Sequence, residues 1–424
     1  MRRSLLAVLV LLFFTGASFG AGFGLYEFGA RASSLGGAVV AQAYDASSAF
    51  YNPAGLAFQK GTQFYGGVTL ISSKNRWVGA APIFSNDVFD SKDKIHTPIG
   101  VYLTHSFSEN FAAGIGVTNP FGLGLEWPDD FPGRVVSRNV DLKSFYISPV
   151  IAFRIHPNLS IGGGVDLVYS TVSLERNALL SLDPPYTDPG QEIGKVMLEG
   201  NSGLGIGFSA SMMYRYQKFS LGFLYRHKVK NEFKEGDAKI TLFDTPFKTF
   251  IANQGVFVDQ KANTEITYPS FISVGTHYQV NEKLGVEFDF MWYKWDVFDV
   301  LALDFEHDEL DTEVREEYSN SSQFRIGLHY QLSEALEARA GYIYDQTPQP
   351  IESMSPLLPD NDRNDFSFGL GYKTGKMSFG VGYMFVDFGE RSTVENGEGK
   401  HFDGFNGTYA SKAHLFFFNY GITL

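Results

Sequence analysis

Long stretches of this chain alternate between apolar residues and smaller or more polar ones. Between residues 376 and 388, apolar side chains fall on every second position: Met377, Phe379, Val381, Tyr383 and Phe385. A period of two indicates β-strands, because successive side chains of a strand point to opposite faces, whereas a helix would space them at three and four. One face of each such strand suits lipid, and the other suits a lumen.

Counting these stretches predicts about fourteen strands. They cover residues 62–72, 96–107, 110–118, 143–155, 159–173, 204–217, 218–231, 265–280, 283–297, 322–333, 335–346, 364–374, 376–388 and 413–424. Turns of a few residues, such as Ser333-Glu334, alternate with long connections at 73–95, 119–142, 174–203, 232–264, 298–321, 347–363 and 389–412.

Bacterial outer-membrane barrels have this asymmetry, with short turns in the periplasm and long loops outside. We therefore predict an all-β membrane protein, a 14-stranded antiparallel up-and-down β-barrel over residues 61–424, in the outer membrane of a Gram-negative type of cell. A soluble β-sandwich or propeller is the alternative, but its loops would not sort so regularly by length.

Composition agrees with a barrel. The chain has 22 Tyr, 40 Phe and 45 Gly, which suit aromatic girdles and a roomy interior, and it has no Cys, so disulfides and thiolate metal sites are excluded. The net charge of −13 argues against nucleic acid as a partner. Much of the acid lies in predicted loops, where it either forms a solvated surface or binds lipopolysaccharide through divalent ions. No cofactor or metal site is predicted.

The N-terminus has the pattern of a secretory signal. Arg2 and Arg3 precede an apolar stretch over residues 5–14, and small residues end at Gly20. We predict a signal peptide over residues 1–20 and a mature protein that starts at Ala21. An uncleaved anchor is the alternative, but the apolar stretch is too short to span a membrane as a helix.

Residues 21–60 alternate poorly and precede the first predicted strand. Within them, Asn52-Pro53-Ala54 predicts a turn whose proline opens a short helix. A barrel of this size has a lumen that must be filled or leak. We therefore predict that residues 21–60 form a small helical N-terminal plug, or hatch, in the barrel lumen.

Several short motifs carry a family resemblance. They include Ala21-Gly22-Phe23, Asn52-Pro53-Ala54, Phe121-Gly122-Leu123, Tyr268-Pro269-Ser270, Arg325-Ile326-Gly327 and Pro359-Asp360-Asn361-Asp362-Arg363. In this order and spacing the chain resembles the FadL-type outer-membrane transporters for long-chain fatty acids and related hydrophobic compounds. The resemblance implies a hatch-bearing barrel in which substrate is caught in a groove between two long outer loops. It then passes to a lumenal pocket near Phe23 and leaves through a lateral gap in the wall.

The resemblance places the capture groove in the connections 174–203 and 232–264. Both contain apolar residues that solvated loops do not need, among them Leu179, Leu180, Met197, Phe243, Phe247 and Phe250. An exposed apolar patch indicates a capture site, although these residues could instead pack one loop on the other.

For the lumenal pocket, the resemblance assigns Arg176 to an amphiphile's head group. A guanidinium can pair bidentately with a carboxylate; the alternative is a loop arginine paired with Glu175. The family's second cation is replaced by Ser321 in this chain, which favours neutral hydrocarbons as substrates. Arg325 and His329 share the lumenal face and could compensate, unless Arg325 pairs with an acid such as Glu287 or Asp289.

The predicted function is passive outer-membrane transport of hydrophobic molecules, long-chain fatty acids or hydrocarbons, by a monomer in contact with outer-membrane lipid and lipopolysaccharide. No enzymatic activity is predicted, because the nine histidines form no recognisable catalytic set and no Gly-x-Ser-x-Gly motif is present. A general or ion-conducting porin is the main alternative, and a structural adhesin is another.

Overall fold

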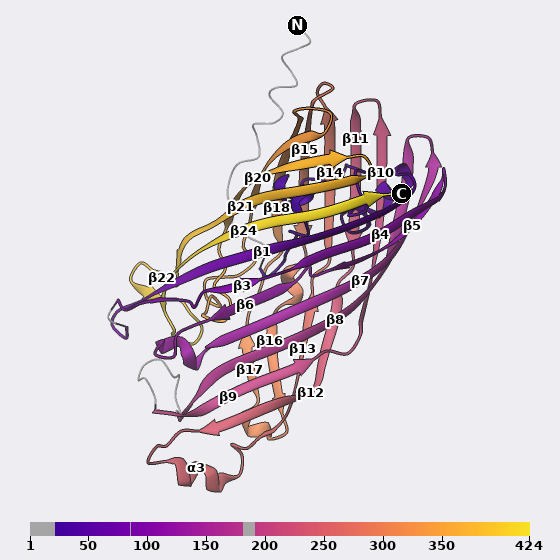
Figure 1. The fold of residues 1–424 in the computed structure, drawn as a ribbon. Helices are drawn as coiled ribbons and strands as arrows, with labels where there is room; N and C mark the ends of the chain where they lie inside the picture. Colours follow the sequence, from indigo (N-terminus) through magenta and orange to yellow (C-terminus); the bar gives the residue numbers. More distant parts are fainter. Residues whose placement is uncertain (1–21, 85, 181–190) are drawn as a thin grey trace.

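In the computed structural model, which describes residues 22–84, 86–180 and 191–424, fourteen antiparallel strands close into a barrel (Figure 1). In order around the wall they are β1 (Thr62–Gly79), β4 (Ile99–Ser108), β5 (Phe111–Thr118), β7 (Asn139–His156), β8 (Leu159–Leu180), β10 (Gly205–Tyr216), β11 (Phe219–Arg226), β14 (Phe271–Gln279), β15 (Leu284–Tyr293), β18 (Ser321–Gln331), β19 (Leu336–Asp345), β20 (Arg363–Thr374), β21 (Met377–Ser392) and β24 (Gly407–Thr423). The ring closes where β24 pairs with β1, from Gln63 to Gly79. The predicted fold class is confirmed.

The two faces of each strand differ as the alternation predicts. On β20, Phe366 and Phe368 are exposed, whereas Asp365 and Ser367, at the alternate positions, are buried. Apolar side chains therefore cover the outside of the wall, and small or polar ones line the inside. The predicted signal peptide, residues 1–20, lies outside the described residues. Among those residues, no helix is long and apolar enough to cross a membrane.

Further strands extend the wall along the long connections. They are β2 (Val88–Asp90), β3 (Lys94–His96), β6 (Gly122–Glu126), β9 (Gln191–Asn201), β12 (Val229–Leu242), β13 (Gln260–Tyr268), β16 (Val300–Phe305) and β17 (Thr312–Arg315), with a small hairpin of β22 (Val394–Glu395) and β23 (Glu398–Gly399). Short helices in the same region are η2 (Pro132–Val135), α3 (Lys248–Gln254), η3 (Trp295–Val297) and η4 (Asp308–Leu310). In Figure 1, α3 lies at the end of the barrel opposite the short turns.

The prediction that 174–203 and 232–264 are loops was therefore wrong for much of their length. Strand β8 continues to Leu180, β9 pairs with it, and β12 pairs with β9 in turn. Backbone hydrogen bonds between neighbouring extensions, β8 with β9 and β9 with β12, hold these segments as strands beyond the main wall. Polar residues occupy both of their faces, so the apolar period that marks the other strands is absent.

The N-terminal segment, residues 22–59, contains α1 (Ala30–Ser34), α2 (Ser48–Tyr51) and η1 (Pro53–Phe58). Asn52 caps η1: its Oδ1 accepts a hydrogen bond from the backbone N–H of Ala54 at 3.2 Å. Its Nδ2 donates to the carbonyls of Val40 at 2.7 Å and of Met212 on β10 at 3.2 Å. Asn52-Pro53-Ala54 thus begins a short helix, as predicted, and Asn52 also joins that helix to the wall.

Strand β8 approaches the same motif closely. The hydroxyl of Ser160 donates to the carbonyl of Ala54 at 2.7 Å. A Cβ at Gly162 would lie 2.5 Å from the backbone nitrogen of Ala54, so only glycine allows this contact.

The barrel wall also holds the segment through β15. Asp289 Oδ2 accepts the backbone N–H groups of Val39 and Val40 at 2.9 and 3.0 Å, and Glu287 Oε1 accepts that of Ala41 at 2.7 Å. The segment is thus hydrogen-bonded to β8, β10 and β15.

Candidate functional site

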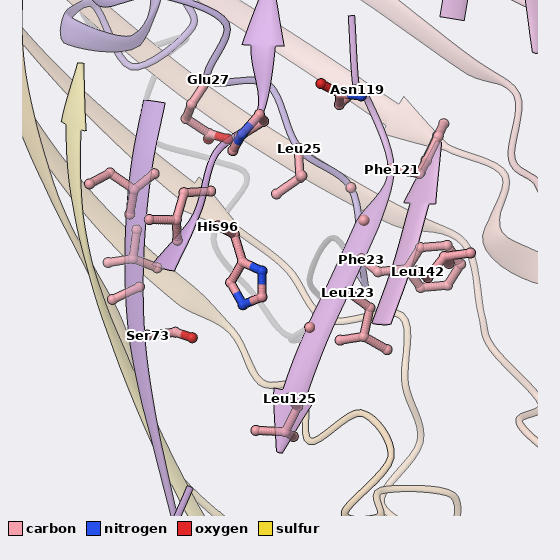
Figure 2. A pocket seen from close by; sticks show the side chains of 18 of the residues that line it. Phe23, Leu25, Glu27, Ser73, His96, Asn119, Phe121, Leu123, Leu125 and Leu142 are labelled. Atoms are coloured by element: carbon pink, nitrogen blue, oxygen red, sulfur yellow. The ribbon is translucent and has the colours of Figure 1, made fainter. Parts of the chain in front are cut away.

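A cavity of about 690 Å³ lies between the N-terminal segment and the inner face of the wall. Its apolar lining includes Phe23, Leu25, Leu123, Leu142 and Leu415, and its polar lining includes Ser73, Lys94, His96, Asp360 and Arg363. Figure 2 shows Phe23, Leu25 and Glu27 of the N-terminal segment facing the same space as side chains from the wall. We call this space the large cavity.

The wall beside the large cavity has a gap in its hydrogen-bonded ladder. Strand β3 pairs with β1 and β6 pairs with β7, but no strand pairing joins β3 to β6 in the part of the chain that the structure describes. The gap is bounded on both sides. On one side β4 pairs with β5, and on the other the N–H of Lys92 donates to the carbonyl of Glu126 at 2.7 Å. Pro98 and Pro120 lie where the two strands break, and neither has an N–H to donate.

His96 lies at this gap. Figure 2 shows its imidazole between Ser73 of β1 and Leu123 and Leu125 of β6. A Cβ at Gly124 would lie 2.0 Å from the imidazole Cε1, so the glycine leaves room for the ring. Sequence reasoning treated His96 only as the start of a predicted strand. The nearby Thr97-Pro98 break was the available signal that this strand is interrupted.

Phe23 lies at one end of the large cavity and is only 4% exposed. Its ring centroid is 4.8 Å from that of Trp295 and 5.3 Å from that of Phe298. The preceding N–H, of Gly22, donates to Asp360 Oδ2 at 3.1 Å. Burial raises the pKa of Asp360 to about 6.

Two smaller cavities, of about 40 Å³ each, continue from the large one. The second cavity shares Phe23, Leu123, Leu142 and Leu358 with the large cavity. The third shares Leu174, Leu301 and Leu357 with the second. The three cavities therefore adjoin in series, and Phe23 stands between the large and the second.

Arg176 lines the third cavity. It donates a hydrogen bond from Nη2 to Thr312 Oγ1 at 3.2 Å. It keeps the parity of Leu174, as the alternation predicted, and both side chains face the same cavity. Glu175, the partner considered in the alternative interpretation, instead pairs with Arg138 and Lys195.

The six predicted capture residues line none of these three cavities. Leu179, Met197 and Phe243 are half-buried, whereas Leu180, Phe247 and Phe250 are exposed, Phe250 by 61%. They belong to the end of β8, to β9 and to the region around α3, which lies at the end of the barrel opposite the short turns (Figure 1).

Arg325 and His329 also lie away from these cavities, although both are buried on the inner face of β18 as predicted. Arg325 donates to Gln323 Oε1 and to the carbonyl of Gly37, and its guanidinium lies 4.3 Å from the ring centroid of Tyr26. The pairing of Arg325 with Glu287 or Asp289 does not form, because those carboxylates accept N–H groups of the N-terminal segment.

His329 belongs to a polar cluster. Its Nε2 lies 3.3 Å from Nε2 of His277, and its Nδ1 lies 3.7 Å from Glu337, which also pairs with Arg31 and Arg339. These contacts link α1 of the N-terminal segment to the wall. No group of three or more potential metal ligands occurs among the described residues.

A closed β-barrel with an apolar outer face defines an integral protein of the Gram-negative outer membrane. Residues 11–423 match the family model described as outer membrane protein transport protein (OMPP1/FadL/TodX). The chain belongs to this family, which confirms the resemblance and the predicted location.

Individual relatives cover most of the chain. It is 28% identical over 424 residues to outer membrane protein P1 of Haemophilus influenzae, with 91% of this chain and 89% of that protein covered. It is 27% identical over 407 residues to a long-chain fatty acid transport protein of Salmonella typhi, with coverage of 90% and 91%.

Solved structures share the fold. A FadL homologue of Pseudomonas aeruginosa gives a TM-score of 0.83 at 19% identity and covers 95% of this chain and 100% of its own. The toluene transporter TodX of P. putida gives 0.72 at 16% identity, with coverage of 94% and 99%.

Proposed function

We propose that this protein carries hydrophobic molecules passively across the outer membrane. Solutes are captured by apolar residues at the outer end, pass through the third and second cavities into the large cavity, and leave sideways between β3 and β6. Long-chain fatty acids and hydrocarbons are the proposed substrates. The names of a fatty acid transport protein and a toluene transporter among the similar proteins support this class.

The observation that carries this proposal is that three adjoining cavities end beside two strands that do not pair. Unpaired strands need no main-chain hydrogen bonds to be broken when a solute passes between them. Each cavity offers mainly apolar lining, and burial of a methylene is worth about 0.8 kcal/mol. Transport down a gradient therefore needs no chemical step.

In this proposal the N-terminal segment is the hatch, and residues 1–20 are removed on export. The segment's bonds to β8, β10 and β15 support a role in closing the axial route. The pathway lies within one chain, so we propose a monomer, surrounded by outer-membrane lipid and lipopolysaccharide. A porin would instead conduct ions steadily through the bore, whereas the proposed transporter is nearly silent in single-channel recordings.

The lateral route can be tested by blocking it. The chain has no native cysteine, so Ser73→Cys, which faces the large cavity beside the gap, can be labelled alone with a bulky maleimide. We expect labelling to reduce uptake of a radiolabelled long-chain fatty acid or alkylbenzene by about tenfold or more, because the bulky group fills the exit; a tenfold change corresponds to about 1.4 kcal/mol. Glu334→Cys, in an exposed short turn, is the matched control. Normal uptake by fully labelled Ser73→Cys would exclude this exit.

A further inference from the structure

The side chain of Lys94 crosses the gap between β3 and β6. Lys94 is opposite Ser73 of β1 in the strand register, so its side chain starts on the face that Ser73 turns toward the large cavity (Figure 2). Its Nζ then lies 2.7 Å from Glu126 Oε2 of β6 and donates to Asn139 Oδ1 of β7 at 2.8 Å. A lysine ammonium therefore lies where the proposed exit leaves the wall.

Glu126 joins the two sides of the gap at the end away from β4. Its Oε1 pairs with Lys92 Nζ at 2.8 Å and its Oε2 pairs with Lys94, so one carboxylate bridges two lysines. The side chains of Lys94 and Glu126 are 32% and 21% exposed, so neither is sealed inside the protein. Because partly exposed ion pairs contribute little net stability, a second carboxylate can replace Glu126 on Lys94 at small cost.

Lys94 also retains hydrogen-bonding capacity. An ammonium group has three N–H donors. Among the described residues, Nζ has two partners, Glu126 Oε2 and Asn139 Oδ1. One donor is therefore left for a solute, even while Glu126 stays in place.

The other long cationic side chains that border the large cavity are less suitable. Arg363 is already paired with Asp345. Lys143 and Lys412 are exposed residues that alternate with buried ones on β7 and β24, so they face the outside of the wall. Lys94 alone of these four residues starts on the cavity side and reaches across the exit.

A carboxylate that leaves through the gap needs a cation. Moving an unpaired carboxylate past apolar side chains is costly, whereas a hydrocarbon chain passes without this cost. We propose that Lys94 is a head-group site at the exit: it binds the carboxylate of a transported fatty acid, beside Glu126 or in its place, while the acyl chain lies in the large cavity. The inference rests on the proposed function, because it assigns carboxylate amphiphiles as the substrate class of the same exit.

Two substitutions with opposite expected effects test the proposal. Dodecanoate and its methyl ester share one chain and differ in charge, and initial uptake of each radiolabelled compound is measured in cells that lack other transporters of this family. Lys94→Met keeps an unbranched side chain without the charge, so we expect the ratio of dodecanoate to ester uptake to fall by about tenfold. Glu126→Gln removes the competing carboxylate, so the same ratio should rise. Lys94→Arg retains a cation and should preserve most of the ratio.

Lys400→Met is the matched control. Lys400 also pairs with a glutamate, and its side chain is likewise 32% exposed, but it lines none of the three cavities. Heat-modifiable migration on gels reports assembly, and Lys94→Gln replaces the methionine variant if the latter does not assemble.

A role that is only structural gives a different result. If Lys94 and Glu126 merely clamp the two strands, either substitution breaks the same ion pair, and both should change the uptake of the two solutes alike. That result, an unchanged ratio in an assembled Lys94→Met variant, or uptake of the ester alone by the wild type overturns the head-group site. Uptake of neither solute by the wild type overturns the proposed function itself.

Discussion

The backbone N–H of Gly22 donates a hydrogen bond to Asp360 Oδ2 across a sequence separation of 338 residues. Asp360 lies in the connection between β19 and β20, where Thr347 Oγ1 donates to the same carboxylate oxygen at 2.6 Å. The contact holds the start of the described chain against the wall. As a result, Phe23 is positioned where the large and second cavities meet.

Asp360→Ala is expected to release this contact. A hydrogen bond to a charged group is worth about 1.5–3 kcal/mol, so we expect the affinity for a hydrophobic ligand to fall by about tenfold as Phe23 loses its position. Asp360→Asn retains an acceptor and is expected to have a smaller effect. Ligand titration by fluorescence measures both, with the exposed Asp403→Ala as the control. An alanine variant with wild-type affinity would show that the contact does not position the site.

Phe23→Ala is expected to impair uptake while leaving the barrel assembled. The ring packs against Trp295 and Phe298, and its loss merges the large and second cavities, so a solute there has fewer contacts. Uptake of a labelled long-chain fatty acid is the measurement, and heat-modifiable migration on gels reports assembly of the barrel. Normal uptake by a correctly assembled variant would contradict this role.

His96→Ala is expected to open the gap between β3 and β6. The imidazole fills space over Gly124, so its removal widens the exit. The uptake rate of bulky solutes, relative to the wild type, should then increase several-fold more than the uptake rate of slender solutes. The comparison is uptake of a branched and a linear hydrocarbon of equal carbon number. His105→Ala changes an exposed histidine of β4 and serves as the control. An equal effect on both solutes would indicate that His96 does not set the width of the gap.

Asn52→Ala is expected to loosen the N-terminal segment. The substitution leaves the carbonyls of Val40 and Met212 without this donor and removes the cap of η1, at a cost of about 1–3 kcal/mol. Single-channel recordings should then show transient openings that the wild type lacks. Asn281→Ala, in an exposed turn, is the control. Steady conductance by the wild type would favour the porin alternative.

The burial of Glu316 predicts a pH dependence of stability. Its pKa is about 8 in the folded protein and close to 4.5 when unfolded, so the folded state binds more protons between these values. Stability therefore falls as the pH rises from about 4.5 to 8. Glu316→Gln should reduce the loss of stability between pH 5 and pH 8 by an amount on the order of a few kcal/mol. Urea unfolding in detergent at both pH values measures this, and an unchanged loss would contradict the burial of a protonated acid.

The sequence alone predicted the barrel because lipid imposes a period of two on the wall, as at Phe366 and Phe368. It predicted the turn at Asn52-Pro53 because capping is a local property. It missed the strand extensions, since backbone pairing beyond the main wall does not require apolar alternation.

The site was harder to predict than the fold. Glu316 lines the second cavity and is 1% exposed, although it belongs to an acidic stretch that looks solvated in the sequence. The gap at His96 likewise depends on the absence of pairing between β3 and β6. A single sequence shows the breaks at Pro98 and Pro120 but not that they lie side by side.

The pairing of β24 with β1 has a consequence for assembly. This seam joins the first wall strand to the last, and the N-terminal segment immediately precedes the first. A segment that fills the lumen must either be inside before the last strand closes the barrel, or enter through one end of the closed barrel afterwards. For the proposed hatch, the order of synthesis suits the first route, because the N-terminal segment is made before the strands of the wall.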